Sequence, residues 1–114
     1  MLDDLKIQIQ TGERHGRRIV RLTGRLNIET VPEFLKVMRG DQSPVVILDF
    51  SGLAYIDSAA VGALIQTHVA FQKSGQLLAL AGVSQRVEAV LDITHVKKIF
   101  RTFPNVATAE EVLG

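Results

Sequence analysis

The sequence predicts a single α/β domain: a mixed, mostly parallel central sheet of four to five strands, about four helices and an N-terminal β-hairpin. Residues 45–50 are apolar except for Asp49 and rich in β-branched side chains, as in a strand buried on both faces. Apolar residues then recur at intervals of three and four from Val61 to Val69, the spacing of one helix face. Strands alternate with helices through short connections, which favours right-handed crossovers and parallel neighbours.

Composition limits the class of protein. The chain has 114 residues, of which 46% are apolar, so residues 1–114 can form one domain with a proper core. Its 13 basic and 12 acidic residues give a net charge of +1, and the basic clusters at 14–18 and 97–101 lack interleaved aromatic residues. We therefore expect neither direct nucleic-acid binding nor membrane insertion. The absence of cysteine and the polar start of the chain favour a cytoplasmic protein without a signal peptide.

The chain begins with a predicted hairpin. Apolar and polar side chains alternate over residues 5–10, as in a strand with one solvated face. Residues 12–16 form the expected turn, and residues 17–23 return as a second strand. We expect residues 24–29 to be a loop.

The first helix is predicted from a capping pattern. Thr30 can cap it and Glu33 can complete a capping box, while Gly40 ends it. Its apolar stripe consists of Val31, Phe34, Leu35 and Met38. After the buried strand, residues 51–57 form a predicted loop, and a long helix follows from Asp57-Ser58 to residue 73.

The carboxyl-terminal part continues the alternation. Ser74-Gly75 breaks the chain before a second buried strand at residues 76–81. Ser84 is expected to cap a third helix that carries Val87, Val90 and Leu91. A short strand is expected at Ile99-Phe100 or in the stretch to Phe103, and Thr108 with Glu111 predicts a capping box for a final helix.

The predicted topology brings three connections to one edge of the sheet. If the main strands run parallel, residues 24–29, 51–57 and 82–84 all lie at their carboxyl ends. Ligands of open α/β sheets bind outside that edge. Ser58 belongs to it, so we take Ser58 as the candidate functional residue.

Asp57-Ser58 has a structural and a functional interpretation. Asp57 can simply cap the helix, with Ser58 as its first residue, because a carboxylate oxygen accepts from an unpaired helical N–H. Alternatively, the Ser58 hydroxyl lies near the positive end of the helix dipole, where a phosphate dianion is stabilised. The small residues that follow (Ala59, Ala60, Gly62 and Ala63) would leave a shallow surface around it, and Tyr55 and Val61 could supply apolar contact area.

A phosphate at Ser58 could control association with another protein. It would add roughly −1.5 to −2 charges beside Asp57. Burying such an unpaired charge costs several kcal/mol, and even ~3 kcal/mol weakens binding on the order of 100-fold.

Residues 45–66 (VVILDFSGLAYIDSAAVGALIQ) resemble the central segment of STAS domains, in particular the bacterial anti-sigma factor antagonists. The family's D-L-S-G and D-S-S-G-L-G correspond here to residues 49–52 and 57–62, and its G-x-L-D to residues 24–27. The resemblance covers nearly the whole chain and implies a STAS-like fold.

This resemblance implies a regulatory protein rather than an enzyme. It implies that the unmodified form binds an anti-sigma factor that is also a serine kinase, that phosphorylation of Ser58 releases it, and that a serine phosphatase resets it. The implied partner-binding residues are Asn27, Asp57, Ser58, Ala59, Ala60 and Val61.

The chain departs from the family pattern at a few positions. Asn27 replaces an aspartate, Ala59 and Ala60 replace a serine and a glycine, and His95 stands where a glycine is often found. A constitutive STAS adaptor in a stress-sensing or lipid-transport complex, with Ser58 only a helix cap, therefore remains an alternative.

Catalytic chemistry is weakly supported by the sequence. Ser58 lacks the G-x-S-x-G context of hydrolases, and no phosphate-loop or dinucleotide fingerprint occurs. His68 falls on the apolar stripe of the long helix and is interpreted as a core or rim residue, while His15 and His95 lack metal-ligand spacing. We therefore expect no catalytic residue, metal or cofactor; a nucleotide-binding or hydrolytic protein is the least favoured alternative.

Overall fold

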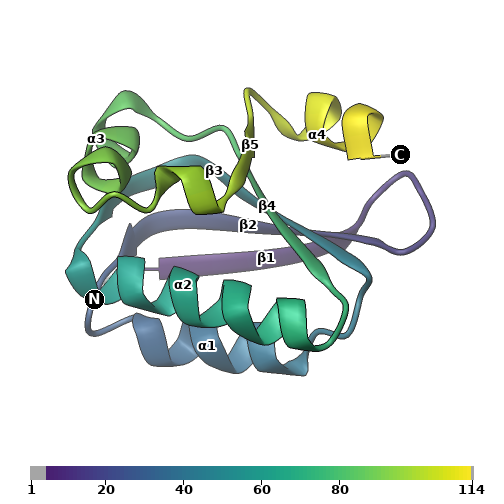
Figure 1. Ribbon diagram of the computed structural model, residues 1–114, viewed down its shortest axis with the longest axis horizontal. Coiled ribbons are helices and arrows are strands. Elements are labelled where there is room, and N and C mark those ends of the chain that lie inside the picture. The colour runs from purple at the N-terminus through teal and green to yellow at the C-terminus, as the bar shows by residue number, and fades with distance from the viewer. Residues whose placement is uncertain (1–4, 114) are drawn as a thin grey trace.

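A computed structural model describes residues 5–113 and contains one five-stranded sheet in the order β1-β2-β3-β4-β5 (Figure 1). β1 is antiparallel to β2, and every other neighbouring pair is parallel. The elements in chain order are β1 (Leu5–Thr11), β2 (Arg17–Leu26), α1 (Val31–Gly40), β3 (Val45–Ile56), α2 (Ser58–Lys73), β4 (Leu77–Ala81), α3 (Gln85–Ile93), the 3-10 turn η1 (Lys97–Ile99), β5 (Arg101–Phe103) and α4 (Val106–Leu113). The predicted mixed sheet with an N-terminal hairpin and four helices is confirmed.

The helices divide between the two faces of the sheet. α1 and α2 lie side by side along one face (Figure 1), where the larger apolar core includes Leu48 and Phe50 of β3 and Leu64 of α2. The β3 residues that alternate with Leu48 and Phe50, such as Ile47, point to the other face, where they form a second cluster with Ala109 of α4. β3 is therefore buried on both faces along residues 45–48, as its continuous apolar run predicts. No helix within residues 5–113 is both long enough and apolar enough to span a membrane.

β2 and β3 are longer than predicted. Residues 24–26 and 51–56, which we expected in loops, continue the two strands as far as the pair Leu26–Ile56. Two register shifts interrupt the ladder, so the side chains lose the simple alternation on which the prediction depended. β2 and β3 approach each other closely at Gly52: a Cβ added to Gly52 would lie 3.0 Å from Thr23 Oγ1.

Two of the predicted caps are wrong. The Thr30 side chain caps no N–H of α1; its hydroxyl accepts from Asn27 N (2.9 Å) and donates to the carbonyl of Arg25 (3.0 Å). α4 starts before Thr108, and Asn105 Oδ1 accepts from Thr108 N at 2.7 Å. In both cases a nearby side chain or backbone group competes successfully for the same hydrogen bonds.

The caps of the other two helices are confirmed. Asp57 accepts from Ala60 N at the start of α2, and Ser84 accepts from Val87 N at the start of α3. The short strand expected near residues 99–103 is also present, as β5.

Helix α4 is attached to the hairpin turn. Glu110 of α4 is only 7% exposed, and its Oε1 accepts from Glu13 N at 2.8 Å. Gly12 permits this approach, because a Cβ at that position would be 2.4 Å from the same oxygen. The contact joins residues 97 positions apart in the sequence.

We expect Glu110→Ala to lower the free energy of unfolding by about 1–3 kcal/mol, because it leaves a partly buried backbone N–H without its charged acceptor. Urea denaturation followed by circular dichroism measures the change. Glu111→Ala is the control, because Glu111 is the next residue on the same helix and its side chain is exposed. Equal losses in the two variants would contradict this role for Glu110.

Candidate functional site

Ser58 lies where the sequence places it, at the carboxyl end of β3. It is the first residue of α2 and is exposed. Figure 1 shows this end of α2 beside the connection that leads from β2 to α1. The hydroxyl is therefore on the surface at the positive end of the α2 dipole.

Asp57 connects the two segments of this site. Its Oδ1 accepts from Ala60 N at 2.9 Å and so caps α2. Its Oδ2 accepts from Ile28 N at 3.0 Å and so holds the connection between β2 and α1. One carboxylate thus fixes the position of Ile28 relative to the first turn of α2.

Asn27 shapes its own segment. Its Oδ1 accepts from Glu29 N at 3.0 Å and from Thr30 N at 3.1 Å, an Asx-type turn. A neutral side-chain oxygen is sufficient for these bonds. The residue is partly exposed beside α2, so the structure brings Asn27 and Asp57 to one surface.

Ala60 and Val61 do not lie on that surface. Ala60 is 0% exposed and Val61 is 4% exposed, because this side of α2 packs on the sheet. This burial argues against the expectation that these two side chains contact a partner and that Val61 supplies apolar contact area. Ser58 and Gly62 are exposed, and Ala59 is partly exposed.

Two large apolar side chains are exposed on the segments around Ser58. Ile28 is 71% exposed in the β2–α1 connection, and Tyr55 is 45% exposed near the end of β3. Tyr55 is one of the residues expected from the sequence to supply apolar contact area, whereas Ile28 is not. An isolated isoleucine between Asn27 and Glu29 in a polar connection was the available signal.

The third predicted connection does not reach this site. β4 pairs with β3 only as far as Asp49–Ala81, and β3 continues beyond that pair to Ile56. Gly82 therefore lies against Ser51; a Cβ added to Gly82 would be 3.1 Å from the Ser51 Cβ. Two of the three predicted connections meet at the candidate site, and residues 82–84 lie against an earlier part of β3.

The histidines are accounted for by packing and backbone geometry. His68 is partly buried, and its ring packs edge-on against Phe100 with centroids 5.5 Å apart, as expected of a rim residue. His95 has φ of 61°, the left-handed conformation that favours glycine. His15 lies in the hairpin turn at the far end of the sheet (Figure 1).

Comparison with known proteins identifies relatives over most of the chain. The model of the STAS domain family matches residues 6–109. The anti-sigma-B factor antagonist of Staphylococcus epidermidis is 31% identical over 98 residues, which cover 83% of this chain and 91% of that protein.

Solved structures share the fold. A putative anti-sigma factor antagonist from Thermotoga maritima has a TM-score of 0.84 at 24% identity, over 92% of each chain. The Bacillus cell fate determinant SpoIIAA in its phosphorylated form has a TM-score of 0.74 at 15% identity, over 96% of this chain and 100% of that chain. The family match over residues 6–109, together with the five-stranded mixed sheet, establishes that this chain belongs to the STAS domain family.

Proposed function

We propose that this STAS domain is an anti-sigma factor antagonist that works in the cytoplasm by partner switching. In this proposal the unmodified form binds an anti-sigma factor that is also a serine kinase. Phosphorylation of Ser58 releases the complex, and a serine phosphatase restores binding. The relatives named anti-sigma factor antagonists support the regulatory role, and the proposal assigns no catalytic residue to this chain.

One observation carries the choice of Ser58. Asp57 caps α2, and among residues 5–113 no hydrogen bond to the Ser58 hydroxyl is found. The hydroxyl is exposed and is not needed as a cap, so a kinase could modify it without breaking a native contact. This argues against the alternative in which Ser58 serves only as the helix cap.

The surroundings of Ser58 suit a protein partner. α2 has no Asp, Glu, Lys or Arg before Lys73, and Gly62 is exposed one turn after Ser58. Ile28 and Tyr55 offer apolar area on the adjoining segments. Apart from the Asp57 carboxylate, whose two oxygens already accept backbone hydrogen bonds, such a patch can be desolvated at little electrostatic cost. A phosphate beside Asp57 would leave two neighbouring anions to be buried.

Incubation with a cognate kinase and ATP, followed by mass spectrometry, is expected to locate the phosphate on Ser58. Ser58→Ala is expected to abolish the modification. Ser74→Ala, which removes an exposed serine at the other end of α2, serves as the control and is expected to leave it intact. Phosphate found only on other residues would refute the assignment of Ser58.

Ser58→Asp is expected to weaken binding of the anti-sigma factor on the order of 100-fold, as a charge buried at a cost of ~3 kcal/mol requires. Ser58→Ala should retain the wild-type affinity, measured by isothermal titration calorimetry. Ser74→Asp carries the same charge at the opposite end of α2 and should also bind normally.

Equal affinities of wild type, Ser58→Ala and Ser58→Asp would exclude charge gating. They would support a constitutive STAS adaptor instead. Affinity purification from the native cell separates these functions further, because an adaptor would recover stress-sensing or lipid-transport subunits rather than a kinase.

Ile28→Ala is expected to weaken the same complex about tenfold, because it removes a largely exposed apolar side chain from the proposed interface. Val112→Ala is the control: Val112 is 55% exposed on α4, away from Ser58. Calorimetry measures both affinities. If the two variants bind alike, Ile28 lies outside the interface.

A further inference from the structure

β1 has a free edge. It is a seven-residue strand at one end of the sheet and, within residues 5–113, pairs only with β2. Its register is continuous from Leu5 to Thr11, without a bulge or proline. The strand at the other end of the sheet, β5, has only three residues. Proteins usually protect a long edge strand by bulges, prolines or a cover, because its unpaired N–H and C=O groups bind other strands.

The pairing with β2 determines which residues of β1 face the free edge. Gly12 N donates to the carbonyl of Arg17 at 2.9 Å, in the same register as the pairs of the β1–β2 ladder. Hydrogen-bonded pairs alternate in an antiparallel ladder, so Gln10, Gln8 and Lys6 bond to β2. The odd-numbered residues therefore direct their backbone N–H and C=O groups outward: Leu5, Ile7, Ile9 and Thr11.

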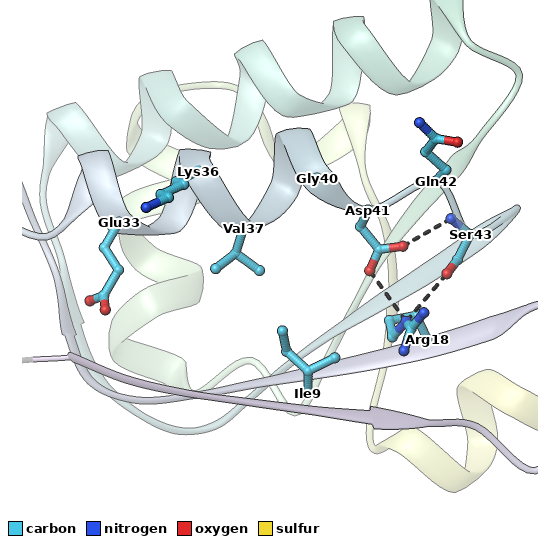
Figure 2. A pocket seen from close by; sticks show the side chains of 9 residues that line it. All are labelled: Ile9, Arg18, Glu33, Lys36, Val37, Gly40, Asp41, Gln42 and Ser43. Carbon is cyan, nitrogen blue, oxygen red and sulfur yellow. Dashed lines mark hydrogen bonds and ion pairs between the residues drawn. The ribbon is translucent and has the colours of Figure 1, made fainter.

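An open groove lies between α1 and β1, where Ile9 is the β1 residue that lines it (Figure 2). Ile9 lies in it and is 51% exposed, with Val37 of α1 among the other lining residues. The charged side chains around it are Arg18, Lys36, Glu33 and Asp41, two of each sign, and Arg18 Nε lies 3.4 Å from Asp41 Oδ2. A second copy of the groove would therefore meet no excess of like charge.

We propose that two copies of this chain pair through β1, antiparallel and centred on Gln8, to form one continuous sheet. In this register Ile7 lies opposite Ile9 of the second copy, Leu5 opposite Thr11, and Lys6 opposite Gln10. No two like charges are opposed, and Ile9 gains an apolar partner across the seam. The pairs of odd-numbered residues are those with outward N–H and C=O groups, so each pair can exchange both backbone hydrogen bonds.

Cysteine cross-linking tests the register, because the natural chain contains no cysteine. Gln8 would face its own copy in a pair without hydrogen bonds, with Cα atoms about 4.5 Å apart, a distance that a disulfide spans. Gln8→Cys is therefore expected to form a covalent dimer under mild oxidation. Lys6→Cys is the matched control: Lys6 is also exposed and on the same face, but would lie roughly 14 Å from its copy.

Sedimentation equilibrium tests the association itself. The wild-type chain is expected to dimerise, and Ile9→Lys is expected to raise the dimer Kd at least about tenfold, because each dimer would hold two lysines at the seam. Val112→Lys makes the same change at an exposed site on α4 and should leave the Kd unchanged. Circular dichroism confirms that both variants are folded.

A monomeric wild-type chain would overturn the proposal and leave the β1 edge to a strand of a different protein. A dimer that Ile9→Lys does not weaken, or equal cross-linking of the two cysteine variants, would overturn it as well. These measurements use neither kinase nor anti-sigma factor, so their outcome is independent of the function proposed for Ser58.

Discussion

The candidate site depends on the carboxylate of Asp57. Its two oxygens accept hydrogen bonds from segments far apart in the sequence, the first turn of α2 and the β2–α1 connection. The bond to Ala60 N makes Asp57 the cap, which releases the Ser58 hydroxyl from that role. The bond to Ile28 N holds an exposed isoleucine near that hydroxyl. An exposed hydroxyl and apolar contact area thus come together through one side chain.

This arrangement requires the length of β2 and β3. Both strands continue beyond the end of β4 and remain paired with each other as far as Leu26 and Ile56. The site is therefore carried on a two-stranded extension of the sheet, with residues 82–84 left behind against Ser51. Two register shifts and the close approach at Gly52 make this extension possible.

The contact between α4 and the hairpin turn lies away from both candidate interaction surfaces. Glu110 joins α4 to the hairpin turn through a partly buried hydrogen bond, far along the sheet from Ser58. The carboxyl end of the sheet bears the hydroxyl and the uncharged start of α2, and the β1 edge leaves backbone groups and Ile9 exposed. Substitutions can therefore probe each surface without removing contacts of the central core.

The sequence by itself determined the class of fold, the order of the elements and the Asp57 and Ser84 caps, because these follow from hydrophobic period and local hydrogen bonding. It also placed Ser58 at the start of α2. Only the tertiary structure decided that residues 51–56 are strand, since bulged pairing with β2 removes the alternation that would reveal it. It likewise decided that Ala60 and Val61 are buried while Ile28 is exposed, because helix packing on the sheet selects which side faces solvent.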